Sequence, residues 1–307
     1  MKKIMVYILL GLFFESNLIE CKMNEVMIQF EGDVIWSGAI GDPNNEAIIF
    51  VHGGPGAPSF YLNPLKKLSE KYYLVFFDQI GGGRSSTRID PKKLNIDYFV
   101  NQIEAVRTHY KLDKFNIYGQ SFGAAFSIEY YKKFPNRISS MILSSPYIDT
   151  DLWVADCSYL ISQMPLKHRN AIRQADSTKD YTNQEYIEAV NHFYQHHVAR
   201  KLPWSDDINN TFEYLGVEVY NFMWGSNEFT PSGKFLKYSC IDFLPKIQVP
   251  VLINIGKYDE VLLQTAIKYQ KLIKNSQLVI NEQAAHLTMQ DNPNFDIIHI
   301  EKFLMNK

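Results

Sequence analysis

The chain has 307 residues, of which 46% are hydrophobic and 21% charged, as is ordinary for a globular protein that buries a core. Its length suits one large α/β domain with an insertion, or two small domains. The formal net charge is −2, with no basic stripe and no acidic tail, so we expect no nucleic-acid partner and no disordered acidic segment.

The first 23 residues have the pattern of a signal segment. Two lysines precede an apolar run from Ile4 to Phe14, and a polar stretch follows. That run is too short to span a bilayer comfortably. We therefore expect export to the periplasm or cell envelope, with an uncleaved N-terminal helix on a cytoplasmic protein as the alternative. "LIEC" vaguely resembles a lipoprotein box ending at Cys21, although Glu20 fits it badly, so the cleavage site and lipidation at Cys21 stay open.

Two of the three cysteines, Cys157 and Cys240, lie beyond this segment. The sequence has no C-x-x-C motif, so it gives no support for a metal site or a thioredoxin-like motif. A Cys157–Cys240 disulfide and two free thiols are equally compatible with the pattern.

From residue 46 to 148, strand patterns alternate with helical patterns. Short apolar runs such as "EAIIFVHG", "KYYLVFFDQ", "KFNIYGQS" and "RISSMILSSP" predict strands, whereas "NIDYFVNQIEAVRTHY" and "FGAAFSIEYYKKF" have apolar residues at helical spacing. This alternation predicts an α/β fold with a mostly parallel sheet and helices on both faces.

The alternation stops between residues 149 and 235, where only helical patterns occur, and it resumes with "VPVLINIG" and "SQLVIN". We therefore predict an α/β core formed by residues 24–148 and 236–307, with a helical lid inserted at 149–235. Aromatic residues are frequent between residues 180 and 240. They suit either the lining of an apolar pocket or the packing of helices.

The stretch "GQSFG", Gly119 to Gly123, predicts a nucleophilic serine. The match to G-x-S-x-G is weak alone, but here it follows a predicted strand and opens a predicted helix. That context is the one in which the serine sits on a strained turn with its hydroxyl exposed, as in α/β hydrolases. We assign Ser121 as the nucleophile; the alternative is a plain tight turn.

The stretch "HGGPG", His52 to Gly56, ends another predicted strand. In this fold the oxyanion hole uses the N–H after the nucleophile, here Phe122, and a second N–H from the loop after an early strand. We choose Gly54 as the second donor, with Gly53 as the fallback. His52 comes too early in the chain to be the base, and we expect it to brace the loop.

The acid and the base should follow Ser121 in the order acid, then histidine. His286 lies in a loop after the strand "QLVIN", whereas His299 lies inside a helical pattern. The strand "VLINIG" is followed by Asp259 and Glu260, of which Asp259 is the better candidate for the acid. The predicted catalytic residues are therefore Ser121, Asp259 and His286.

The motifs "HGGPG", "FDQIGGGRSS", "GQSFGAA", "GKYDE" and "AAHLTM", in this order, resemble the proline iminopeptidase family of serine peptidases. They look most like its branch containing the tricorn-interacting aminopeptidase. The resemblance covers roughly residues 25–305, and it includes the lid segments "YIEAVNHFYQHHVAR" and "GSNEFTPSG".

This resemblance implies a serine aminopeptidase that removes the N-terminal residue, often proline, from short peptides or aminoacyl amides. It also implies that two glutamates hold the free α-ammonium group of the substrate, and these map to Glu260 and Glu228. A desolvated ammonium requires such paired charges. Three features depart from the family pattern: Ile80 where many members have arginine, "QAAH" before the histidine, and the export signal.

Other functions stay open at this point. The same three residues would serve an amino-acid amidase or an esterase or lactone hydrolase, and a non-catalytic binding protein on a hydrolase scaffold is a third class. The expected reaction needs no metal and no cofactor, and a monomer is the expected state. The preferred N-terminal residue does not follow from sequence because it depends on the shape of the pocket.

Overall fold

This computed structural model describes residues 22–307. The predicted signal segment, apart from Lys22 and Met23, and the question of lipidation at Cys21 lie outside the described residues. Within the described part, none of the helices is both long and apolar enough to cross a membrane.

The centre of the fold is an eight-stranded sheet in the order β1-β2-β4-β3-β5-β6-β7-β8. Its strands are β1 (Asn24–Phe30), β2 (Asp33–Ile40), β3 (Ala47–Val51), β4 (Tyr73–Phe77), β5 (Phe115–Gln120), β6 (Ile138–Ser144), β7 (Val251–Gly256) and β8 (Ser276–Asn281). From β4 to β8 neighbouring strands are parallel, which confirms the predicted mostly parallel sheet.

One edge of the sheet differs from the sequence-based expectation. No strand is predicted before residue 46, whereas β1 and β2 form an antiparallel hairpin there, and β2 also pairs antiparallel with β4. The hairpin is hard to predict because β1 is an edge strand with only one buried residue, Ile28, so its hydrophobic alternation is weak.

Helices cover both faces of the sheet, because successive residues of the central strands point to opposite sides. Ile49 and Val51 of β3 belong to one hydrophobic core, and Ile48 and Phe50 belong to the other. The first face is covered by α1 (Ile96–His109), α2 (Phe122–Lys133) and α8 (Leu263–Leu272), and the second by the 3₁₀ helix η1 (Ser59–Glu70) and by α10 (Pro293–Asn306). Shorter helical turns are η2 (Pro135–Arg137), η3 (Ile241–Lys246) and α9 (Thr288–Asp291).

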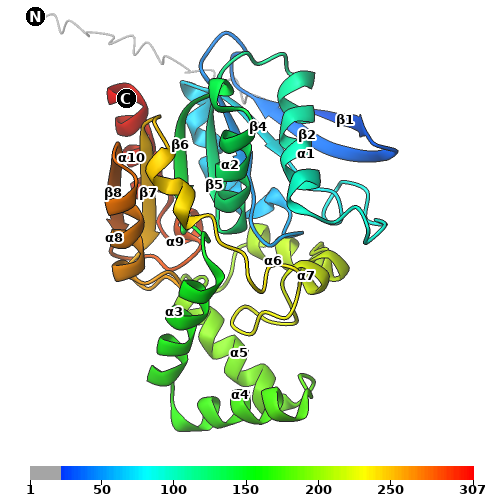
Figure 1. The fold of residues 1–307 in the computed structure, drawn as a ribbon, viewed down its shortest axis with the longest axis vertical. Coiled ribbons are helices and arrows are strands. Elements are labelled where there is room, and N and C mark those ends of the chain that lie inside the picture. Colours follow the sequence, from blue (N-terminus) through cyan, green and yellow to red (C-terminus); the bar gives the residue numbers. More distant parts are fainter. Residues whose placement is uncertain (1–21) are drawn as a thin grey trace, which may run out of the picture.

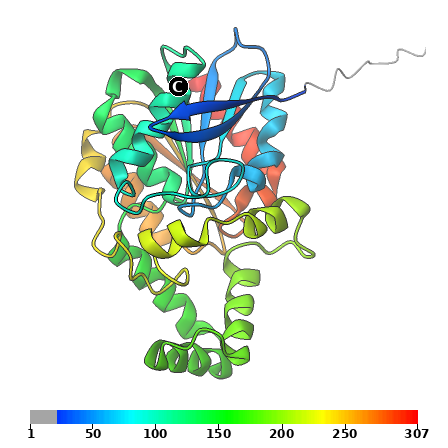
Figure 2. The same cartoon turned by 90° about the vertical axis from the view of Figure 1, so that its right-hand side faces the viewer.

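Five α-helices lie between β6 and β7: α3 (Thr150–Gln163), α4 (Leu166–Thr178), α5 (Gln184–His197), α6 (Asp206–Glu213) and α7 (Val217–Met223). Figure 1 shows that α3, α4 and α5 project below the sheet domain, and Figure 2 shows the same projection from the side. We call residues 149–235 the lid. The side chain of Asp149 caps α3 by accepting from the Leu152 N–H, so the lid begins at a defined helix start.

Two contacts attach the start of the lid to the sheet domain. Asp156 of α3 accepts hydrogen bonds from the Leu262 N–H at 3.0 Å and from the Thr265 hydroxyl at 2.9 Å. It thereby caps α8, whose own N-cap residue provides no side-chain hydrogen bond. Cys157, on the same helix, and Cys240 are both free and buried, so the two-thiol alternative is the one found here.

Candidate active site

Ser121 lies on the turn between β5 and α2, with φ 55° and ψ −123°. Side-chain-bearing residues seldom adopt this conformation. Its glycine neighbours make the turn feasible: a Cβ on Gly123 would lie 2.0 Å from the Val51 carbonyl oxygen, and one on Gly119 would lie 2.4 Å from the Gly123 oxygen. Only glycine fits at both positions, so "GQSFG" is fixed by packing around the serine.

Asp259 and His286 follow the ends of β7 and β8, and Ser121 follows the end of β5. The carboxyl ends of parallel strands meet at one edge of the sheet, which is why residues far apart in sequence come together there. The His286 Nδ1 lies 2.8 Å from Asp259 Oδ1. Because Nδ1 is engaged in this way, Nε2 is the ring nitrogen left to act on a neighbouring hydroxyl.

The loop that carries His286 is hydrogen-bonded to the C-terminal end of lid helix α5. The His286 N–H donates to the His197 carbonyl at 3.0 Å, and the Leu287 N–H donates to the Val198 carbonyl at 2.8 Å. The His197 ring Nδ1 also lies 2.9 Å from the Tyr258 carbonyl, next to the acid. Lid and histidine loop therefore share a short stretch of backbone pairing.

The two glycines considered as oxyanion donors differ in their contacts. The Gly53 N–H donates to the Tyr61 hydroxyl at 2.8 Å, and that hydroxyl donates to Gln120 Oε1 at 2.7 Å. Gly54, in contrast, lines the cavity beside Ser121. The N–H of Phe122 belongs to the first turn of α2, where backbone donors have no partner within the helix. The Gly53 N–H is thus already engaged by Tyr61, and Gly54 stays the candidate for the second donor.

His52 is a brace between two strands. Its Nε2 accepts from the Gln79 N–H at 2.8 Å, and its Nδ1 lies 2.9 Å from the Gly53 carbonyl. Complete burial lowers the pKa of His52 to about 4, so the ring is neutral and suited to one donated and one accepted hydrogen bond. His299 lies in α10, and its Nδ1 contacts the Phe295 carbonyl.

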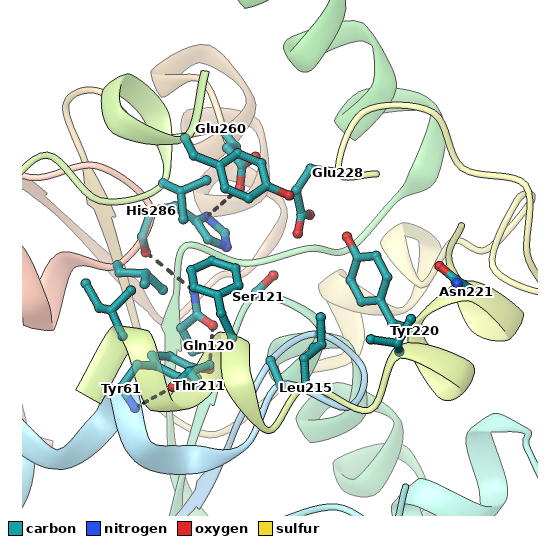
Figure 3. Close-up of a pocket in the computed structure, with 18 of the residues that line it drawn as sticks. Tyr61, Gln120, Ser121, Thr211, Leu215, Tyr220, Asn221, Glu228, Glu260 and His286 are labelled. Atoms are coloured by element: carbon teal, nitrogen blue, oxygen red, sulfur yellow. Dashed lines mark hydrogen bonds and ion pairs between the residues drawn. The ribbon is translucent and has the colours of Figure 1, made fainter. Parts of the chain in front are cut away.

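A cavity of about 250 Å³ opens between the sheet edge and the lid and is lined by Ser121, His286, Glu228 and Glu260, among others (Figure 3). Glu260 is buried, whereas Glu228 stays partly accessible from the cavity. The Oε2 atom of Glu260 lies 3.6 Å from His286 Nδ1, and within residues 22–307 its Oε1 has no hydrogen-bond partner.

The two glutamates place two carboxyl groups at the same cavity. Burial raises the pKa of Glu228 above its ordinary value. Burial, followed by the charges of Glu228 and Asp259, raises the pKa of Glu260 well above its ordinary value. A buried carboxylate pair of this kind is stabilised by a cationic ligand, which would bring both pKa values down again.

Sequence reasoning missed Tyr220 of α7, whose hydroxyl points toward Glu228 (Figure 3). The hydroxyl partly offsets the rise in the pKa of Glu228 that burial causes. The two groups nevertheless do not reach normal hydrogen-bond geometry. Gln120 and Thr211 also line the cavity without having been predicted. The only sequence signal for Tyr220 is the abundance of aromatic residues in this part of the chain.

Comparisons with known proteins agree with this geometry. Residues 46–293 match the family model described as the alpha/beta hydrolase fold, which confirms the predicted fold class. The chain is 35% identical to a proline iminopeptidase of Saccharolobus solfataricus over 85% of either chain. It is 37% identical to that of Thermoplasma volcanium over 90% of this chain and 94% of the relative.

A solved structure is similar over nearly the whole described chain. The crystal structure of a proline iminopeptidase of Mycobacterium smegmatis superposes with a TM-score of 0.85 at 25% identity, and the match covers 92% of this chain and 98% of that one. Coverage of this extent includes the lid as well as the sheet, so the similarity is not confined to the common α/β core.

Proposed function

This chain belongs to the proline iminopeptidase family within the α/β-hydrolase fold, and from that membership we propose how it acts on its substrate. The protein is a serine hydrolase of the aminopeptidase type. We propose that it releases the N-terminal residue of a short peptide or aminoacyl amide through an acyl-enzyme on Ser121. The observation that carries this proposal is that Ser121, His286 and the Glu228–Glu260 pair face one cavity.

In the proposed reaction, Ser121 Oγ attacks the carbonyl carbon while His286 takes the hydroxyl proton. Asp259, bonded to Nδ1, holds the ring and stabilises its protonated form. The N–H groups of Gly54 and Phe122 stabilise the oxyanion. The C–N bond then breaks, and His286 gives its proton to the leaving amine. In the second half-reaction His286 takes a proton from water, the water oxygen attacks the acyl carbon, and Ser121 leaves with that proton.

The glutamate pair supplies recognition. A substrate α-ammonium between Glu228 and Glu260 would be neutralised by them and would place the carbonyl of the first residue against Ser121. Within the described part of the chain Glu260 Oε1 accepts no hydrogen bond, which supports this placement because a buried acceptor without a donor is costly unless a ligand supplies one. Since the pKa of each glutamate is raised in the free protein, binding of the ammonium should release protons to the solvent.

A pair of substrates tests the recognition step. We expect an aminoacyl-arylamide with a free amine to be cleaved and its N-acetylated twin to be nearly inert. Equal cleavage of both would contradict the ammonium site and favour an esterase or lactone hydrolase with the same three catalytic residues. A panel of arylamides with Pro, Leu and Ala would then rank the first residue, and simple amino-acid amides would separate peptidase from amidase preference.

Three finer features remain proposals from the sequence. The lid motifs support placement in the branch that contains the tricorn-interacting aminopeptidase. The basic and apolar start of the chain supports export to the periplasm or cell envelope, and a monomer is the proposed state. N-terminal sequencing of the native protein with cell fractionation tests export, and light scattering tests the oligomeric state; an unprocessed cytoplasmic protein would contradict export.

A further inference from the structure

Ser145 is the residue that directly follows β6, and it is completely buried. Its φ is 47°, in the left-handed region that favours glycine. A side-chain-bearing residue persists in this conformation when its surroundings over-determine it, and such residues cluster at functional sites. The position therefore calls for an interaction that glycine cannot make.

The Ser145 hydroxyl makes two such contacts. Its Oγ lies 2.6 Å from Asp259 Oδ2 and 2.8 Å from the His286 carbonyl oxygen. A hydroxyl has one proton to donate, and a bond to a carboxylate is the shorter and stronger one. The proton therefore belongs on the Asp259 side, where Oδ2 also accepts from the Gly256 N–H at 3.2 Å.

This hydroxyl also determines which carboxylate the histidine uses. His286 Nδ1 has Asp259 Oδ1 at 2.8 Å and Glu260 Oε2 at 3.6 Å, so two adjacent acids compete for one N–H. By holding Oδ2, Ser145 keeps the carboxylate of Asp259 turned with Oδ1 toward the ring. Glu260 is then left free for a ligand in the cavity.

Backbone hydrogen bonds fix the position of Ser145 beside Asp259. Its N–H donates to the Asn254 carbonyl of β7 at 2.7 Å, and the preceding residue, Ser144, accepts from the Ser121 N–H at 3.0 Å. Ser145 is thus anchored between the nucleophile turn and the strand that leads to the acid.

We infer that Ser145 is a positioning residue of the catalytic site, which fixes Asp259 against His286 and leaves Glu260 for the substrate amine. This inference rests on the proposed serine-hydrolase mechanism. It predicts that Ser145→Gly has opposite effects on stability and on catalysis. Glycine suits the left-handed backbone better, so the variant should fold well, but the hydroxyl is lost, so kcat should fall.

The test compares Ser145→Gly and Ser145→Ala with a matched control, Ser140→Ala. Ser140 lies on β6, the strand that Ser145 follows; it is equally buried and donates its hydroxyl to Asn116 Oδ1 at 2.8 Å, away from the cavity. Loss of one hydrogen bond to a charged group should lower kcat for a free-amine arylamide about tenfold to a hundredfold in both Ser145 variants, with little change in KM. Ser140→Ala should keep the wild-type kcat.

A second measurement separates positioning from general destabilisation. The downfield proton resonance of the His286 Nδ1–H···Asp259 bond should shift or broaden in both Ser145 variants and stay unchanged in Ser140→Ala. Thermal unfolding should show Ser145→Gly to be at least as stable as Ser145→Ala.

The outcomes separate this inference from the proposed mechanism. A wild-type kcat and an unchanged resonance in Ser145→Gly would overturn the role of Ser145. If Ser121→Ala kept its activity, the proposed mechanism itself would fail. If Ser121→Ala were inactive while Ser145→Gly was normal, only the positioning role would be lost.

Discussion

The sheet domain and the lid contribute different chemistry to one cavity. Ser121, Asp259 and His286 all follow strands of the sheet, at positions set by hydrogen-bonded backbone. Glu228 and Tyr220 come from the lid, where short helices and loops place them. In the proposed mechanism, bond cleavage depends on the sheet edge alone, while recognition of the substrate amine needs Glu260 from the sheet edge and Glu228 from the lid.

The largest effect should come from the sheet domain. Ser121→Ala removes the attacking oxygen and should lower kcat by at least about 10⁴-fold while the protein stays folded. Steady-state kinetics with circular dichroism would measure both. Retention of the wild-type rate would end the assignment of Ser121, and a serine-directed covalent probe should label the wild type but not the variant.

The lid should show its effect in binding. Glu228→Gln removes one charge of the proposed ammonium site and should lower kcat/KM for free-amine substrates by at least about 30-fold, equivalent to about 2 kcal/mol, mainly through KM. Glu213→Gln, an exposed change on lid helix α6, is the matched control and should have no effect. An unchanged kcat/KM in Glu228→Gln would remove the lid from recognition.

A buried acid beneath the histidine loop makes the stability of the sheet domain depend on pH. Asp296 accepts from the Thr288 hydroxyl at 2.6 Å, and burial raises its pKa to about 6. The folded protein therefore holds this proton more tightly than the unfolded chain does, so the stabilisation is complete below pH 4 and is lost as pH rises through 6.

Comparing the wild type with Asp296→Asn isolates the contribution of the Asp296 carboxyl to the pH dependence of stability. Between pH 4 and pH 7, the free energy of unfolding of the wild type should fall relative to that of the variant by about 2 kcal/mol. Urea unfolding at several pH values would measure the difference. A difference that is constant with pH would show that Asp296 does not titrate in this range.

The smallest effects should be equal in the two regions. Leu166 of the lid and Ile298 of α10 are exposed to the same extent, 60%. Leu166→Ser and Ile298→Ser should each change the free energy of unfolding by less than about 0.5 kcal/mol, because neither side chain is packed. A much larger loss at Leu166 in thermal unfolding would indicate that another surface covers this part of the lid.

The sequence allowed the fold and the catalytic candidates to be predicted because their signals are local. A serine between two glycines after an apolar strand, an acid at the end of the next strand but one, and a histidine after the last strand each lie within a short window. The edge hairpin β1–β2 lacked such a signal, since most of β1 is exposed.

The supporting residues lacked local signals for a different reason. Ser145 acts on Asp259, 114 residues away, and Tyr61 joins Gly53 to Gln120 across 59 residues. Such partners are defined by the packing of the folded chain. Glu228 was identified only through the family resemblance, because no pattern in the neighbouring sequence distinguishes it from a solvent-exposed lid residue.

The backbone pairing between residues 197–198 and 286–287 bears on engineering this protein. It means that the lid is not an exchangeable module, since transplanting another lid would also replace the two carbonyl groups that hold the histidine loop. A chimaera designed for a new specificity should keep the native end of α5 and vary lid residues that line the cavity beyond it, such as Phe212, Leu215 and Asn221. Specificity can then change while the base keeps its support.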